Sequence, residues 1–198
     1  VVSTKVLSPG AAVAIAAFMN ILGAFLTTAV AKTIGTGIVD PAGITDQVII
    51  AALLSAIIWN LITILMGLPV SSSHALVGGL IGAAAAHGGI SILNSDGIMK
   101  IFTSLLISPL FGFVIGYAFM KLILFLFGHL SPGTISKYFG RLQIVSSSFM
   151  AFGHGSNDAQ KAMGIITMAL FASGKITTLD VPTWVVITCA LAMGFGTI

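Results

Sequence analysis

The chain has 198 residues, of which 57% are hydrophobic and only 7% are charged, and its formal net charge is +3. Soluble domains carry about 25% charged residues, so this composition excludes an ordinary soluble fold and favours burial in a lipid bilayer. The few basic residues form no cluster with interleaved aromatics, which argues against a nucleic-acid partner.

Long apolar stretches in the first half of the chain predict membrane-spanning helices. We expect an ordinary continuous helix over 10–31 and a second helix over 46–68, ended by Pro69. The next apolar stretch, 73–86, is shorter than the roughly 20 residues that cross a bilayer core. It therefore predicts a re-entrant half helix.

The second half of the chain adds further apolar stretches, at 101–127, at 142–171 and from Pro182 onward. Between the first two of these, residues 128–141 form the most basic segment, and the excess of Lys and Arg in cytoplasmic loops predicts a cytoplasmic connecting loop there. The chain has no initiator Met and stops at Ile198 inside an apolar run. We expect a piece of a longer protein.

The first polar motif follows the second predicted span and reads Pro69-Val70-Ser71-Ser72-Ser73-His74. Pro69 ends the preceding helix, and the three serines fall where the next helix begins. Hydroxyls and free backbone N–H groups at a helix N-terminus attract an anion, which predicts a site for a tetrahedral oxyanion. The alternative is that the serines only cap the helix.

The second polar motif interrupts an apolar stretch with Gly153-His154-Gly155-Ser156-Asn157-Asp158-Ala159-Gln160-Lys161. The glycines predict an unwound stretch, with Asn157 and Asp158 near the start of the half helix that follows. An ionisable residue inside a membrane segment is costly and indicates function, such as binding of a hard cation like Na⁺. The alternative is that Asp158 and Lys161, three residues apart, only neutralise each other.

Both motifs resemble those of a known family. The segment 153–161 looks like the Gly-X-Asn-Asp signature of the inorganic phosphate transporter family, and 69–74 resembles that family's Pro-Val-Ser-Thr-Thr-His element. Residues 1–9 also resemble the stretch that follows the family's first Asn-Asp signature. The two motifs together are more specific than either one alone.

The resemblance implies the fold class and the organisation of the chain. The expected fold is all-α, a polytopic helical membrane protein with inverted repeats, broken helices and a re-entrant half-helix hairpin. Residues 1–127 would be the remainder of the first repeat, 128–141 the cytoplasmic connecting loop and 142–198 the start of the second repeat. The expected location is the plasma membrane, and an assembly of identical copies is left open.

The resemblance also implies a secondary transporter that moves inorganic phosphate with H⁺ or Na⁺ and uses no other cofactor. The expected phosphate ligands are Ser71, Ser72, Ser73, Ser156 and Gln160. The expected coupling residues are Asn157, Asp158 and Lys161, and Na⁺ would bind at the first two of these.

One departure from the family pattern concerns the coupling ion. The family's signature often continues Asn-Asp-Val-Ala-Asn, and Lys161 stands where that last Asn is expected. We expect its ammonium to take part of the space and charge of a coupling cation. This favours symport with H⁺, or transport of a metal-phosphate complex, over symport with Na⁺.

Two other interpretations of these motifs stay open. The same fold could carry sulfate, since hydroxyl donors separate two tetrahedral oxyanions poorly. A more distant alternative is an intramembrane enzyme, because Ser73, His74, His154 and Asp158 contain the ingredients of nucleophilic or metal chemistry. The chain lacks a His-Glu-x-x-His or Gly-x-Ser-x-Gly motif, so we expect no enzyme.

Overall fold

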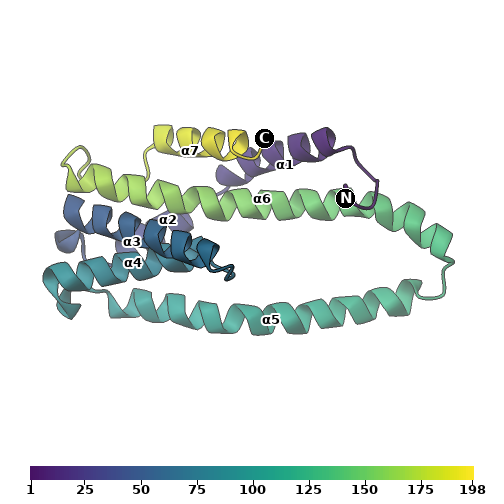
Figure 1. The fold of residues 1–198 in the computed structure, drawn as a ribbon, viewed down its shortest axis with the longest axis horizontal. Coiled ribbons are helices and arrows are strands. Elements are labelled where there is room, and N and C mark those ends of the chain that lie inside the picture. The colour runs from purple at the N-terminus through teal and green to yellow at the C-terminus, as the bar shows by residue number, and fades with distance from the viewer.

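The computed structural model describes residues 1–198, apart from the side chains of Thr36 and Ala42. The described part of the chain is helical, with one isolated β-bridge between Val39 and Leu93 and no strand, as expected for an all-α fold (Figure 1). Its elements are α1 (Pro9–Ala24), α2 (Ala29–Gly37), a 3₁₀ turn (Pro41–Gly43), α3 (Asp46–Leu65), α4 (Ser72–Gly88), a second 3₁₀ turn (Ile90–Ile92), α5 (Ser95–Phe127), α6 (Pro132–Ala172) and α7 (Thr183–Phe195).

The first apolar stretch is broken, so the expectation of one continuous helix over 10–31 is wrong. α1 ends at Ala24, and the axis turns by 62° before α2 begins. The new helix start needs partners for its first N–H groups. Ala29 N–H donates to Thr27 Oγ1 at 3.1 Å, and Val30 N–H donates to Gln160 Oε1 at 2.8 Å. These bonds stabilise the break.

α3 and α4 form a hairpin whose faces pack closely. Gly67, at φ +67°, lies in the turn that follows α3, where a residue without Cβ meets no steric penalty. A Cβ at Gly79 on α4 would lie 2.6 Å from the Ala52 carbonyl oxygen on α3. α4 has 17 residues, which fits the expected half helix in length.

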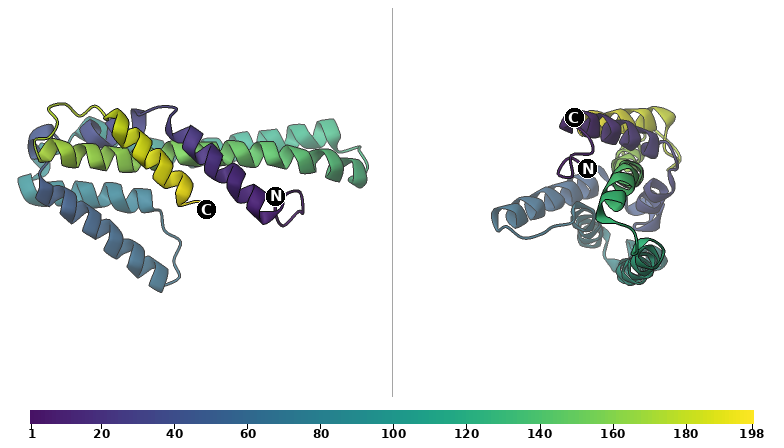
Figure 2. Two further views of the ribbon diagram at one scale, coloured as in Figure 1. Left: turned by 90° about the horizontal axis from the view of Figure 1, so that it is seen from above. Right: turned by 90° about the vertical axis from the view of Figure 1, so that its right-hand side faces the viewer.

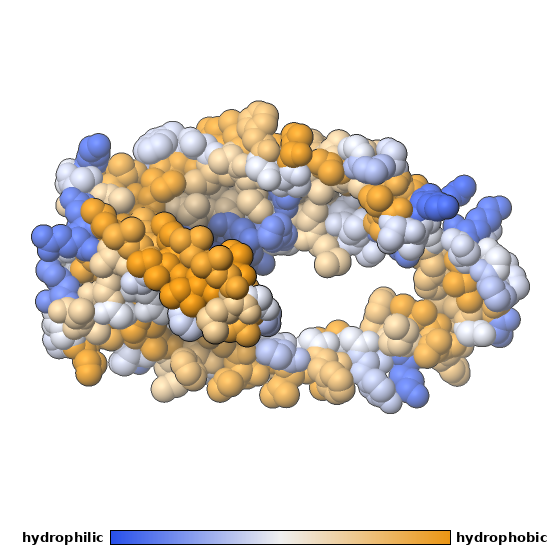
Figure 3. Space-filling view, viewed as in Figure 1, coloured by the Kyte–Doolittle hydropathy of each residue, from blue (hydrophilic) through white to orange (hydrophobic). Residues whose placement is uncertain are grey.

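α5 is tied to the other helices near its N-terminal end. Asn94 N–H donates to Ile38 O at 2.9 Å, and Asp40 N–H donates to Ile92 O at 2.8 Å. α5 runs on through Pro109 with no buried residue among those described. Its far half stands away from α6 (Figure 1; Figure 2, right), and an opening lies between the two helices in the space-filling view (Figure 3).

α6 is the central element and packs against α1, α2 and α7. It begins at Pro132, where Ser131 Oγ accepts Thr134 N–H at 3.4 Å and proline occupies the first turn. These are ordinary helix-start signals. The loop expected over 128–141 is therefore too long, because only the residues from Gly128 to Ser131 connect α5 to α6. The cytoplasmic side of this connection and the division into repeats stay predictions.

Among the described residues, two helices, α3 and α5, are long and apolar enough to cross a membrane. The bent pair of α1 and α2 would be a third span, and α7, with 13 residues, is shorter. Most large apolar side chains of α3 and α5 are exposed, with Leu65 at 86% and Phe125 at 83%. Such faces are typical of helices that meet lipid or other helices.

Candidate functional site

The second polar motif lies within an unbroken helix. α6 continues from Pro132 to Ala172, so the predicted unwinding over 153–161 is wrong. The motif's second glycine serves close packing instead, because a Cβ at Gly155 would lie 2.1 Å from the Asn20 carbonyl oxygen of α1. A Cβ at Gly23 would meet the Phe152 carbonyl in the same way, at 2.0 Å. The close approach of α1 therefore uses these glycines.

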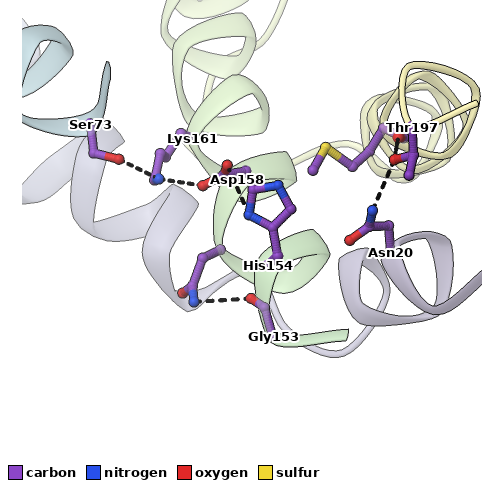
Figure 4. Close-up of polar contacts among 9 residues, drawn as sticks. Asn20, Ser73, Gly153, His154, Asp158, Lys161 and Thr197 are labelled. Carbon is purple, nitrogen blue, oxygen red and sulfur yellow. Dashed lines mark hydrogen bonds and ion pairs between the residues drawn. The ribbon is translucent and has the colours of Figure 1, made fainter. Parts of the chain in front are cut away.

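Three polar side chains of α6 form a stripe along one face of the helix. Residues at helical spacing i, i+4 and i+7 share a face, and His154, Asp158 and Lys161 have this spacing. Asp158 Oδ2 lies 3.3 Å from His154 Nδ1, and Asp158 Oδ1 accepts from Lys161 Nζ at 2.5 Å (Figure 4). The exposed fraction of the side chains falls along the stripe, from 57% at His154 to 39% and then 25% at Lys161.

The least exposed end of this stripe, at Lys161, meets the first polar motif. Ser71 caps α4, and its Oγ accepts His74 N–H at 3.4 Å. Lys161 Nζ donates a short hydrogen bond to Ser73 Oγ, which joins α6 to the first turn of α4 (Figure 4). The structure thus brings together Ser73, Asp158 and Lys161, three of the predicted site residues.

A cavity of about 530 Å³ opens at this meeting point, within the range of small-molecule sites. Its polar lining consists of Thr33, Ser71, Ser73, His74 and Lys161, and the rest is apolar. Among the described side chains that line it, Lys161 alone carries a permanent charge and none is acidic. The one permanent charge on the described lining of this largely apolar cavity is thus positive.

Two of the predicted phosphate ligands, Ser156 and Gln160, have other hydrogen-bond partners. Gln160 is 1% exposed, its Oε1 accepts Val30 N–H, and its Nε2 donates to Ser156 O at 2.7 Å and to Ser156 Oγ at 3.3 Å. Neither residue lines the cavity. Their contacts are those of a buried brace between α6 and α2.

Asn157 and Ser72 lie at the margin of the site. Asn157 is exposed, and its Nδ2 donates to Gly153 O at 3.0 Å, within α6. Ser72, also exposed, is the first residue of α4, where its N–H has no intrahelical acceptor. Each oxygen of Asp158 already contacts one partner, so a cation at Asn157 and Asp158 would share the carboxylate with His154 and Lys161.

His154 and Asn20 are polar residues that the predicted set of ligands did not include. The spacing of four residues to Asp158 is a signal that could have found His154. Asn20 Nδ2 donates to Thr197 Oγ1 at 2.9 Å, and these residues are 177 positions apart, so no local pattern indicates the contact. Both His154 and Asn20 line a second cavity of about 440 Å³ between α1, α6 and α7.

Apolar helices, a broken span and polar side chains between helices define a multi-pass helical membrane protein. A family model described as the phosphate transporter family matches residues 1–136 and 129–198. The chain therefore belongs to the phosphate transporter family, as its two motifs suggested. This is a family of transporters rather than of enzymes.

Relatives with curated names agree with this assignment. A protein of Bacillus subtilis named "Probable low-affinity inorganic phosphate transporter" is 48% identical over 199 residues, covering 99% of this chain and 60% of the relative. A protein of Rhizobium meliloti with the same name is 46% identical and covers 100% of this chain and 60% of the relative. The chain thus spans about three fifths of these relatives' length.

A solved structure has the same fold. It is described as "The sodium-dependent phosphate transporter", and it superposes with a TM-score of 0.82 at 22% identity, covering 98% of this chain and 67% of that chain. At this identity the likeness bears on the arrangement of the helices alone.

Proposed function

We propose that the complete protein moves inorganic phosphate across the membrane together with a cation, by alternating access to a site between α4 and α6. The main support for this proposal is that Lys161 donates hydrogen bonds both to Asp158 on α6 and to Ser73 on α4. It brings the two family motifs into one site. The names of the relatives support phosphate as the substrate.

The anion would bind at the N-terminus of α4. The first N–H groups of a helix lack intrahelical acceptors, and the helix dipole favours negative charge there. The hydroxyls of Ser71, Ser72 and Ser73 add donors, and the Lys161 ammonium adds a full positive charge at the cavity wall. Ser156 and Gln160, tied to α2, would support this site from behind rather than contact phosphate.

The coupling cation would bind at Asp158, with Asn157 beside it on α6. Lys161 already places a positive charge against this carboxylate, which favours H⁺ or a metal-phosphate complex over Na⁺. The solved relative is named for its sodium dependence, and that name describes the relative alone. Phosphate uptake that rises steeply with external Na⁺ and is unchanged by a proton uncoupler would contradict this assignment of the coupling ion.

The test of the function is gradient-driven uptake of radiolabelled phosphate by the complete protein in proteoliposomes. We expect Asp158→Asn to abolish accumulation, because the amide cannot take up a proton and lacks the negative charge of the carboxylate. Lys137→Met, an exposed substitution near the start of α6, is the matched control and should leave uptake unchanged. Accumulation at the wild-type rate by Asp158→Asn would show that the cation binds elsewhere.

Sulfate is the second candidate substrate, and one observation favours it. Among the described side chains that line the cavity none is acidic, so the lining offers a protonated phosphate no carboxylate acceptor. A protonated phosphate needs an acceptor, whereas sulfate does not. Competition of unlabelled sulfate against labelled phosphate decides between them, since a phosphate site should tolerate an excess of sulfate.

A further inference from the structure

The Lys161 ammonium contacts the predicted anion site and the predicted cation site at the same time. We propose that Lys161 is an exchangeable internal counter-ion. It pairs with Asp158 when the site is empty and turns to the anion when phosphate binds. Asp158 then becomes available to the coupling cation only while phosphate is present. This inference rests on the proposed function and adds a mechanism for coupling.

The position of the ammonium supports this exchange. An ammonium has three donors, and two of them contact Asp158 Oδ1 and Ser73 Oγ. Ser73 lies in the first turn of α4, where the anion would bind. An anion at this turn would therefore meet Lys161 without a large movement of α6. The long, flexible stem of lysine permits the small shift that remains.

The charges of the site explain why the exchange would couple the two ions. In the empty site the carboxylate and the ammonium neutralise each other, which lowers the cost of ionised groups at membrane depth. An anion that recruits the ammonium leaves Asp158 without its cationic partner. The uncompensated carboxylate then favours a cation, and by linkage the bound cation favours the anion.

The lining of the cavity is consistent with a single mobile charge. Among the described side chains that line it, Lys161 is the only permanent cation. His154, on the other side of Asp158, is 57% exposed and contacts the second carboxylate oxygen. His154 can hold the carboxylate in place while Lys161 leaves it.

The experiment uses the complete protein in proteoliposomes and measures flux of the coupling cation without phosphate, with fluorescent indicators of H⁺ and Na⁺ inside the vesicles. We expect Lys161→Met to leak cation at least about tenfold faster than wild type, because Asp158 is then permanently available. The double variant Lys161→Met with Asp158→Asn should not leak. Lys137→Met should behave as wild type. A correctly folded Lys161→Met protein that leaks no more cation than wild type would overturn the proposal.

Two further measurements guard against a misfolded variant. The wild-type protein in detergent should bind the coupling cation in the presence of phosphate and lose most of this binding in its absence. Equal cation binding in both conditions overturns the proposal without any substitution. Lys161→Arg, which keeps the charge, should stay coupled, whereas Lys161→Met should weaken phosphate binding by about 10- to 100-fold.

The outcomes separate this inference from the proposed function. A wild-type protein that moves no phosphate refutes the function itself. If the wild-type protein couples phosphate to a cation and Lys161→Met leaks no more cation than wild type, only the counter-ion role is refuted.

Discussion

The side-chain oxygen of Gln160 on α6 accepts the backbone N–H of Val30 in the first turn of α2, at 2.8 Å. The residue before Lys161 thus holds the start of the helix that follows the break, while Lys161 itself reaches the first turn of α4. Two neighbouring residues of one motif therefore brace two helix N-termini. The motif positions the surrounding helices as well as supplying polar groups.

The first prediction concerns this brace. Gln160→Leu should lower the free energy of unfolding by about 1–3 kcal/mol, because Val30 N–H loses its acceptor in a buried place. Thermal unfolding of the detergent-purified protein measures the change. Gln47→Leu, at an exposed position near the start of α3, is the control and should change stability by less than about 0.5 kcal/mol. Equal effects of the two substitutions would contradict the role of the brace.

The second prediction compares the two glycines of the α6 motif. Gly155→Ala should destabilise the protein by about 1–3 kcal/mol, since its Cβ would lie 2.1 Å from the Asn20 carbonyl oxygen. Gly153→Ala meets no atom within 4 Å and should be neutral or stabilise the helix by up to about 1 kcal/mol. Thermal unfolding of both variants tests this. If the helix unwound here during transport, Gly153→Ala would instead impair uptake without lowering stability.

The amino-acid sequence was enough to locate the two polar motifs and the class of fold. Polar residues are rare in so apolar a chain, and Ser73 and Lys161, which are 88 positions apart, both lie in the motifs that resemble those of the family. The hydrogen bond between these two residues shows that the motifs meet in the fold. Helical periodicity does not indicate this contact.

The break in the first span could not be predicted in this way. Residues 25–28, Phe-Leu-Thr-Thr, contain neither proline nor glycine, and the partner of Val30 N–H lies 130 positions away. At Gly155 the error was the opposite one. The glycine suggested an unwound helix, but the helix is intact and the glycine lets α1 approach it closely. A glycine permits both outcomes, and only its neighbours in space decide which one occurs.

The third prediction concerns His154, which contacts Asp158 Oδ2, the oxygen that Lys161 does not contact. His154→Ala should slow phosphate uptake several-fold without abolishing it, because Asp158 keeps its contact with Lys161. The initial rate of radiolabelled phosphate uptake, compared with that of Asp158→Asn, measures the difference. A His154→Ala protein as inactive as Asp158→Asn would mean that the imidazole does more than orient the carboxylate.

The last prediction separates neighbouring serines at the start of α4. Ser73 accepts a hydrogen bond from Lys161 and lines the cavity, whereas the side chain of Ser72 is exposed and does not line it. Loss of a hydroxyl that contacts a charged group costs about 1.5–3 kcal/mol, so Ser73→Ala should weaken phosphate binding by roughly 10- to 100-fold. Ser72→Ala should change it by less than about threefold, because the backbone N–H that faces the anion remains. The concentration dependence of uptake by the complete protein gives both values. Equal weakening by the two substitutions would place the anion over the whole first turn of α4 rather than beside Lys161.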